Sequence, residues 1–252
     1  MLMTKEIKLM QKIVRSMKKI VIEPVFRIQE DCLFFNFIDN SGVTNIQLKI
    51  FKKFFSKYEY RKNLYIKVNF VFLDKIMAKA KEGDSLFISF DDNENPARMK
   101  ITLTNERRKK EYELPLIETN EKDMAVYNKD LNMQYDYKVI MGTEDIIEVI
   151  ESMIFNTEKL VLEVDKDNIK LKESDVTKGK SSFTLKDFDE KGLKQSIKVK
   201  VNVLLFKNIV EFSNVIAEKS MFSVRTDYPL QIVTVTPECE LKSILAPLVE
   251  ND

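Results

Sequence analysis

The amino-acid sequence predicts an α+β fold built from two duplicated domains, each an antiparallel sheet with two helices. Three observations lead to this prediction. Two short segments recur in the same order, apolar residues recur at helical spacing in a few stretches, and much of the rest consists of short alternating runs bounded by turn residues. The chain has 252 residues, of which 44% are hydrophobic, so each half can build a core of its own.

The duplication is carried by two pairs of segments. Residues 66–77 read IKVNFVFLDKIM and residues 199–210 read VKVNVLLFKNIV, at a spacing of 133. The dipeptide at residues 16–17, Ser-Met, recurs at residues 152–153, at a spacing of 136. Two matches in the same order at nearly equal spacing favour duplication over chance. We therefore predict a first domain over residues 1–116, a connector over residues 117–134 and a second domain over residues 135–252.

Helical periodicity is clearest in residues 7–21. One face of this helix is apolar and consists of Met10, Ile13, Val14, Met17, Ile20 and Val21. The opposite face carries the cations Lys8, Lys12, Arg15 and Lys19. A second helix is expected over residues 72–81, with Lys75 and Lys79 on its exposed side. One basic helix is usually a solvated face, but two in one repeat favour a polyanionic partner.

The β candidates are short and alternate in polarity. In the first half they cover residues 21–28, 32–38, 43–50, 64–70, 85–90, 99–104 and 111–116. In the second half they cover residues 135–141, 159–164, 168–173, 181–185, 197–203, 221–226, 230–236 and 243–248. Residues 1–5 leave room for only a short first strand.

Composition excludes most enzyme chemistry. The chain has no histidine, so Ser-His and Cys-His pairs, imidazole bases and imidazole metal ligands are unavailable. It contains neither of the usual glycine-rich phosphate motifs. We expect no cofactor and no metal, and we expect the chain not to be an enzyme. Cys32 and Cys239 stand far apart in apolar surroundings, which indicates reduced packing cysteines.

One acidic stretch of the sequence contains residues that could support catalysis. Asp91, Asp92 and Glu94 could hold a hard cation, which makes a metal-dependent nuclease a remote alternative function. However, Asp, Asn and Pro in a row between two alternating segments are typical of a turn that joins strands. The turn is the better interpretation. The N-terminus lacks the apolar stretch of a signal peptide, and no apolar run reaches 18 residues, so an intracellular, soluble chain is expected.

At the level of motifs the chain resembles sliding clamps of the proliferating-cell-nuclear-antigen (PCNA) type, found in eukaryotes, archaea and some of their viruses. The resemblance rests on four stretches in the family's order: residues 39–43 (DNSGV), 68–77 (VNFVFLDKIM), 226–230 (TDYPL) and 245–250 (LAPLVE). It implies a DNA clamp fold, in which three two-domain subunits close head to tail into a ring with helices lining the hole. It also implies a processivity factor that encircles duplex DNA in replication and repair.

The resemblance assigns roles to residues already singled out. The cations expected to face DNA are Lys8, Lys12, Arg15, Lys19, Lys75 and Lys79. Subunits would pair through residues 107–116 of one chain and 178–187 of the next, with the interface residues Lys109, Lys110, Tyr112, Ser181 and Phe183. The two lysines would lie against the acidic residues Asp187, Asp189 and Glu190. Closing the ring would remove both exposed sheet edges.

Partner enzymes of this family dock a short motif ending in aromatic residues, the PIP box, into an apolar pocket. DNA polymerase, clamp loader, flap nuclease and ligase are the partners implied. The pocket residues carried over by the resemblance are Ile38, Val43, Met124, Val126, Leu131, Pro229, Ile244, Ala246, Pro247 and Val249. Strand packing is the competing interpretation of each. Asn45 and Leu248 differ from the family pattern, in which an aliphatic residue and a basic residue are usual.

Charge is divided unevenly between the halves. Residues 1–115 carry a net charge of +8 and the remainder carries −7. The positions that match Lys8, Lys12 and Arg15 in the second half are the acids Glu144, Glu148 and Glu151. Two explanations stay open: a heterotrimer whose other chains supply positive helices, or halves of opposite sign that favour head-to-tail association. The alternative function is accordingly a clamp-like subunit of a mixed ring, a checkpoint-type clamp or a monomeric processivity factor. The expected location is the nucleus for a eukaryotic or viral protein and the cytoplasm or nucleoid for an archaeal one.

Overall fold

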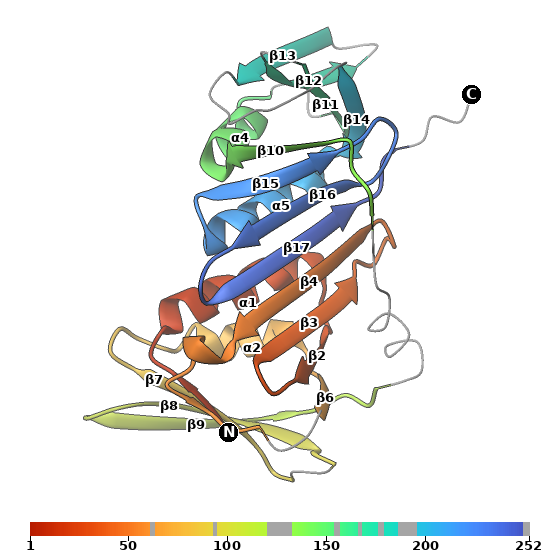
Figure 1. Ribbon diagram of the computed structural model, residues 1–252. Helices are drawn as coiled ribbons and strands as arrows, with labels where there is room; N and C mark the ends of the chain where they lie inside the picture. Colours follow the sequence, from red (N-terminus) through yellow and green to blue (C-terminus); the bar gives the residue numbers. More distant parts are fainter. Residues whose placement is uncertain are drawn as a thin grey trace. The chain divides into compact units, whose positions relative to one another are not determined.

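The computed structural model describes residues 1–60, 64–92, 95–119, 133–153, 157–165, 168–175, 179–185 and 196–248 (Figure 1). The chain divides into two compact units. The first consists of Met1–Asn40, Ile46–Asp130 and Thr236–Glu240, and the second of Ser41–Asn45, Leu131–Val235 and Leu241–Asp252. Each unit therefore includes a short piece from the other half of the chain. The domain boundaries at residues 116 and 135 stay predictions.

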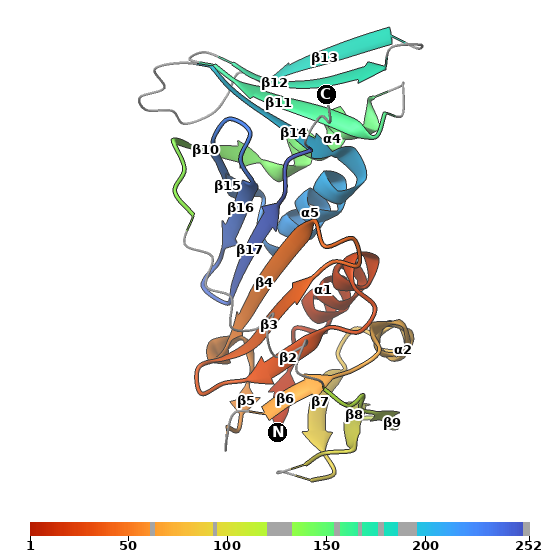
Figure 2. The same ribbon diagram turned by 90° about the vertical axis from the view of Figure 1, so that its right-hand side faces the viewer.

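The first unit contains helices, antiparallel strands and one 3₁₀ turn. Its elements are β1 (Leu2–Thr4), α1 (Ile7–Ile20), β2 (Val25–Ile28), β3 (Cys32–Ile38), β4 (Thr44–Phe51, from Ile46 onward), η1 (Lys52–Phe54), β5 (Lys57–Tyr58), β6 (Leu64–Lys67), α2 (Phe70–Met77), β7 (Ser85–Phe90), β8 (Arg98–Asn105) and β9 (Arg108–Pro115). The strands follow two orders, β5-β1-β7-β8-β9 and β4-β3-β2-β6. Figures 1 and 2 show α1 and α2 on one face of β2, β3 and β4.

The second unit has the same composition. Its elements are β10 (Tyr137–Gly142), α4 (Thr143–Glu151), β11 (Lys159–Val164), β12 (Ile169–Asp175), β13 (Gly179–Leu185), β14 (Ile197–Asn202), α5 (Val203–Ile216), β15 (Lys219–Val224), β16 (Leu230–Val235) and β17 (Cys239–Leu245, from Leu241 onward). Its strand orders are β10-β15-β16-β17 and β13-β12-β11-β14. The α+β class with antiparallel sheets is confirmed. None of the described helices is long and apolar enough to cross a membrane.

The two units repeat one topology. Chain order matches β1, β7, β8 and β9 with β10, β15, β16 and β17, and it matches β4, β3, β2 and β6 with β13, β12, β11 and β14. The matched strands occupy the same positions in the two pairs of strand orders, and only β5 has no counterpart among the described strands. The duplication predicted from two short sequence matches therefore extends to the whole arrangement of these strands.

The apolar stripe predicted on the first helix is the buried face of α1. All six residues of that stripe are buried, since Met17 is 0% and Val21 is 8% exposed and the other four lie between. Burying one such side chain completely stabilises the fold by about 1.5–3 kcal/mol. Helix α1 ends where the stripe does, because the backbone of Val21 is extended; the N–H of Val21 still donates the last helical hydrogen bond, to the Met17 carbonyl.

The repeated Val-Asn dipeptide begins a helix in both units. In the first unit, Asn69 Oδ1 accepts hydrogen bonds from the backbone N–H groups of Val71, at 2.9 Å, and Phe72, at 3.3 Å. In the second, Asn202 Oδ1 accepts from the N–H of Leu205, at 3.0 Å. These are N-cap bonds, which satisfy N–H groups that have no partner within the helix.

Several predicted boundaries are wrong by a few residues. Helix α2 spans Phe70–Met77 and not residues 72–81, because the Asn69 cap starts it earlier, and Lys79 lies in the turn that follows it. Strand β9 begins three residues before the predicted start because Asn105 pairs directly with Arg108 in a tight turn. Strand β17 begins at Cys239 because the N–H of Thr236 donates to the Cys239 carbonyl and closes a hairpin there.

Candidate functional site

Five of the six cations predicted to face DNA lie on one pair of packed helices in the first unit, and the sixth, Lys79, lies in the turn after them. All six side chains are exposed or half-exposed: Lys8, Lys12, Arg15 and Lys19 on α1, Lys75 on α2 and Lys79 just after it. We call this set the helical basic surface. The two helices run side by side, because Gln11 Nε2 donates to the Met77 carbonyl at 2.6 Å. The cations of both helices therefore belong to a single surface.

Some of these cations have acidic neighbours that the sequence does not reveal. Lys8 Nζ lies 3.1 Å from Glu82 Oε1, and Arg15 Nε lies 3.7 Å from Asp74 Oδ1. Asp74 also pairs with Lys18. Both predicted cations remain mostly exposed, at 72% and 64% of their side chains, so these pairs contribute at most about 1 kcal/mol each. Within the described residues, Lys12 makes no ion pair.

An aromatic ring interrupts the helical basic surface. The Phe72 side chain is 52% exposed, and Lys75 Nζ lies 5.6 Å from the centre of its ring. Cation–π attraction of this kind orients the lysine at an exposed site. The predicted Lys75 is thus held near the N-terminal half of α2.

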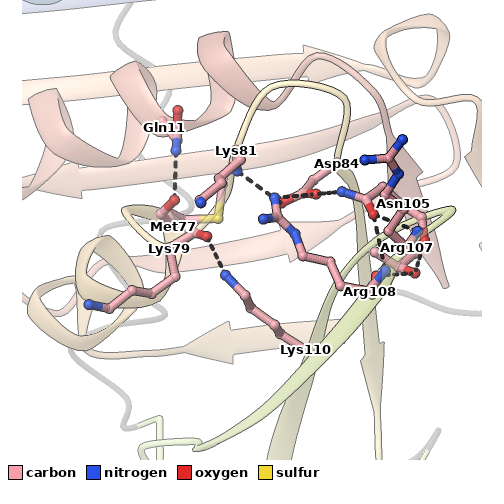
Figure 3. Close-up of polar contacts among 10 residues, drawn as sticks. Gln11, Met77, Lys79, Lys81, Asp84, Asn105, Arg107, Arg108 and Lys110 are labelled. Atoms are coloured by element: carbon pink, nitrogen blue, oxygen red, sulfur yellow. Dashed lines mark hydrogen bonds and ion pairs between the residues drawn. The ribbon is translucent and has the colours of Figure 1, made fainter.

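Strand β9 is an edge of the first unit, with one neighbouring strand, β8, in the described part of the chain. Alternate side chains along β9 are more buried, and these include Lys110 and Tyr112. Lys110 Nζ donates a 2.9 Å hydrogen bond to the carbonyl of Lys79, which places the end of α2 beside this strand (Figure 3). Lys109 points to the other side and pairs with Glu111 at 2.8 Å. Of the predicted interface residues, Lys110 and Tyr112 therefore share the helix side of the edge.

A buried carboxylate anchors the turn at the start of β9. The side chain of Asp84 is 1% exposed and accepts hydrogen bonds from Arg108 Nη2 at 2.9 and 3.0 Å and from the Lys81 N–H at 2.9 Å (Figure 3). Asn105 also donates to it. Burial alone raises the pKa of Asp84, but the bonds from Lys81, Arg108 and Asn105 and the Arg108 charge outweigh it, so the pKa lies below its ordinary value.

Strand β13 is the corresponding edge of the second unit, with β12 as its one described neighbour. Ser181 and Phe183 lie on its more buried side. Ser181 Oγ donates a 2.8 Å hydrogen bond to Glu173 Oε1, and Glu173 is 2% exposed. Glu173 also lines a pocket of about 300 Å³, together with Ile150, Glu151 and Met153 at the end of α4 and with Leu204 at the start of α5.

Helix α4 carries acids where α1 carries bases. Glu144, Asp145, Glu148 and Glu151 are all exposed. Glu151 pairs with Lys207 of α5 at 3.1 Å, and Lys207 lies 3.8 Å from Glu211. The first three acids make no ion pair among the described residues.

The sequence and the fold can be compared with known proteins. Residues 2–125 match the family described as "Proliferating cell nuclear antigen, N-terminal domain". The chain belongs to the PCNA family of sliding clamps. A DNA polymerase sliding clamp of Thermococcus gammatolerans is 24% identical over 247 residues, which cover 95% of this chain and 94% of that protein. Proliferating cell nuclear antigen of Chaetomium thermophilum is 21% identical over 179 residues, or 71% of this chain and 67% of that protein.

A solved structure has the same fold. The crystal structure of PCNA from Entamoeba histolytica matches with a TM-score of 0.86 at 15% identity, and the match covers 98% of each chain. This likeness shows that the chain has the PCNA clamp fold. PCNA-type clamps are scaffolds and not enzymes, which confirms the prediction that this chain is not an enzyme and removes the nuclease alternative.

The acidic run considered for that alternative forms a turn, as expected. Asp91 Oδ1 accepts the backbone N–H groups of Asp92, Ala97 and Arg98 at 3.0–3.1 Å. Hydrogen bonding from the Arg98 N–H, followed by the others, lowers the pKa of Asp91. Glu94 lies outside the described residues, and those that are described contain no group of three or more His, Cys, Asp or Glu able to hold a metal ion.

The residues predicted to form a partner pocket are described in part. In the second unit, Val43, Pro229, Ala246 and Pro247 are half-buried and Ile244 is buried. The N–H of Ala246 donates to the Val43 carbonyl at 2.9 Å, so these two residues are neighbours. Ile38 is half-buried at the end of β3 in the first unit. Met124, Val126, Leu131 and Val249 lie outside the described residues, as do Asp187, Asp189 and Glu190.

Proposed function

We propose that this chain is one subunit of a ring that encircles duplex DNA and tethers a replicative DNA polymerase to it. The observation that carries this proposal is the helical basic surface, whose cations lie on two packed helices and the turn after the second, in a chain of the sliding-clamp family. Lysine and arginine contacts to phosphates hold DNA without reading its sequence. A clamp that must slide needs contacts of this kind, because base-specific contacts would stop it.

Ring closure is supported by the internal duplication. In the first unit, the N–H of Phe51 on β4 donates to the Glu238 carbonyl at 2.8 Å, and Lys49 pairs with Glu240 of β17 at 3.0 Å. The duplicated counterparts of β17 and β4 are β9 and β13, which are edges among the described strands of the single chain. We propose that β9 of one copy pairs with β13 of the next, so that three copies close head to tail and leave no edge exposed.

Partner docking forms the other half of the proposal. Val43, Pro229, Ala246 and Pro247 are half-buried residues of the second unit, and the hydrogen bond from Ala246 to Val43 makes two of them neighbours. We propose that DNA polymerase, clamp loader, flap nuclease and ligase insert PIP-box-type motifs there. The site of action follows the host's DNA: the nucleus for a eukaryotic or viral protein, the nucleoid for an archaeal one.

Alanine substitution of the α1 cations tests the DNA interaction. We expect the triple variant Lys8→Ala, Lys12→Ala, Arg15→Ala to bind duplex DNA more weakly, and the slope of log affinity against log salt to fall by about 0.9 for each phosphate that is no longer neutralised. Sequence preference stays unchanged. The matched control replaces Lys52, Lys53 and Lys57, which are cations of the same unit outside both helices. Equal binding by the two triple variants would contradict the proposal.

Light scattering separates the homotrimer from the clamp-like alternatives. A homotrimer has three times the chain mass of 29.6 kDa. The acidic face of α4 favours the second candidate, a subunit that needs sister chains, because an inner helix with four acids repels DNA. A monomer at tens of micromolar that trimerises only when sister clamps are added would establish that candidate.

A further inference from the structure

We infer that the outward face of β10, β15 and β16 in the second unit is a second docking surface for partner proteins, beside the pocket proposed for their PIP-box-type motifs. The part of the partner that fits this face is a short apolar segment flanked by acidic residues. The inference rests on the proposed function, because it extends the docking of the same partners onto residues outside that pocket.

The inward face of these three strands packs on helix α5. Phe222 of β15 is 0% exposed, and its ring centre lies 6.4 Å from that of Phe206 on α5 (Figures 1 and 2). Ser220 and Thr234 share this face, since their hydroxyl oxygens lie 2.7 Å apart, and Val139 of β10 pairs with Phe222. Because successive side chains of a strand point to opposite faces, the residues between these ones face away from α5.

The outward face carries adjacent apolar side chains. Ile140 pairs with Met221, and Met221 pairs with Val233, so the three lie next to one another across β10, β15 and β16. Val235 stands two residues beyond Val233 on the same face. Ile140 is 44% and Val235 is 60% exposed, while Met221 and Val233 are half-buried. We call these four residues the outer apolar patch.

Such a patch is unusual on a sheet of this kind. An antiparallel sheet with one face on the core normally carries polar side chains on the other face. Single exposed apolar residues are common on protein surfaces, whereas adjacent ones mark a site of interaction with another molecule. The outer apolar patch spans three neighbouring strands, so it belongs to the second kind.

The outer apolar patch is continuous with the proposed partner pocket. Strand β17 lies beside β16, and the hairpin between them is closed by the bond from the Thr236 N–H to the Cys239 carbonyl. Counting back from this hairpin places Ile244 opposite Gln231, which is two residues from Val233. Ile244 is a predicted pocket residue, and it is therefore a diagonal neighbour of Val233 on the outward face. A partner held in the pocket can reach the patch without crossing another element.

Two lysines at the rim indicate the charge of the occupant. Lys138 lies two residues before Ile140, and Lys219 lies two residues before Met221, so both belong to the outward face. Both are exposed, and within the described residues neither makes an ion pair. Acidic residues beside an apolar segment complement these charges, whereas basic ones are repelled. Charge complementarity thus selects an apolar segment with acidic flanks.

Peptide selection against the full chain tests the inference. One displayed library carries a fixed PIP-box-type motif with about eight random residues on each side, which reach roughly 25 Å when extended. A fully random library competes with it. We expect the parent to enrich flanks that combine apolar with acidic residues. The variant Ile140→Ser, Val235→Ser is expected to retain the motif and to lose this preference, while the control Leu204→Ser, an exposed residue of α5, keeps it.

Fluorescence anisotropy with an enriched peptide gives the size of the effect. We expect Ile140→Ser, Val235→Ser to weaken binding of the extended peptide by at least about tenfold, and binding of the motif alone by less than about twofold. Lys219→Glu is expected to weaken the extended peptide as well, and more so at low than at high salt. Its matched control is Lys159→Glu, because Lys159 is also exposed and also begins a strand of the second unit. Circular dichroism checks that every variant is folded.

The other outcomes separate this inference from the proposed function. If the motif is retained without preferred flanks, or if the parent and the Ile140→Ser, Val235→Ser variant prefer the same flanks, the docking surface is wrong and the pocket stands. If motif-bearing peptides do not outcompete random ones, the pocket is wrong. The random library then decides the inference, because apolar peptides with acidic residues must still bind the parent and not the variant. Self-association that this variant abolishes in light scattering would make the face an interface between copies and overturn the inference.

Discussion

Arg108 donates two hydrogen bonds, of 2.9 and 3.0 Å, to the buried carboxylate of Asp84. The two residues are 24 positions apart, and the pair joins the loop after α2 to the first residue of the edge strand β9. The geometry of that edge thus depends on one carboxylate that is 1% exposed.

Replacing this carboxylate is expected to destabilise the first unit. In Asp84→Asn, Arg108 and the Lys81 N–H are left without a charged acceptor inside the protein, and we expect the free energy of unfolding to fall by about 1–3 kcal/mol. Chemical denaturation followed by circular dichroism measures it. The matched control is Asp92→Asn, an exposed acid in another loop of the same unit. Equal stability of the two variants would show that the pair contributes little.

The same pair predicts an acid-dependent loss of stability. The pKa of Asp84 in the folded chain is lowered from its ordinary value of 3.8, so its stabilisation is fully present above that value. It is lost as the pH falls through the folded-state pKa. The difference in unfolding free energy between parent and Asp84→Asn should therefore be constant above about pH 5 and shrink below about pH 4. A difference that grows on acidification would reverse the assigned direction.

Removing either helix cap is also expected to lower the free energy of unfolding. Asn69→Ala and Asn202→Ala each leave backbone N–H groups of the first helical turn without their acceptor, and we expect a loss of about 1 kcal/mol in unfolding free energy. Asn69→Ser and Asn202→Ser are the matched controls, because serine also caps helices well. Alanine and serine variants of equal stability would mean that the caps contribute nothing.

The two cysteines are expected to be unreactive in the folded chain. Both are 1% exposed, and burial, with a smaller effect of Asp31 on Cys32 and of Glu238 on Cys239, raises the pKa of each thiol to about 12. The reactive thiolate is therefore scarce at about pH 8. With a chromogenic disulfide reagent we expect both thiols to react at least about 100-fold more slowly in the native than in the denatured chain. One fast native thiol would contradict this, and Cys32→Ser would identify which.

Local sequence patterns predict the elements in which buried residues recur at regular spacing along the chain. The stripe from Met10 to Val21 predicts α1 almost to the residue, because a helix brings every third or fourth side chain to one face wherever it packs. Apolar periodicity places the start of α2 two residues late, because it does not register the capping side chain of Asn69. The Val-Asn dipeptide that reveals the duplication is also the cap signal, and as such it locates both helices.

Other features had no signal in the local sequence. Asp84 stands in a charged stretch that looks solvent-exposed, and its partners Asn105 and Arg108 follow more than 20 residues later. The sequence around Asp74 likewise does not indicate that this residue lies beside Arg15. Ion pairs and buried carboxylates depend on distance in space, which neither composition nor periodicity encodes.

The sequence by itself determined the duplicated α+β organisation, the buried stripe of α1, the sign of the charge in each half and the family. These properties depend only on the types of residue and on their spacing, so they can be predicted without coordinates. Only the tertiary structure decided which of the described strands remain edges, which cations meet an acid, and that the end of α2 lies beside the edge strand β9. Packing brings together residues that are distant along the chain, and the energy of each interaction is set by that proximity.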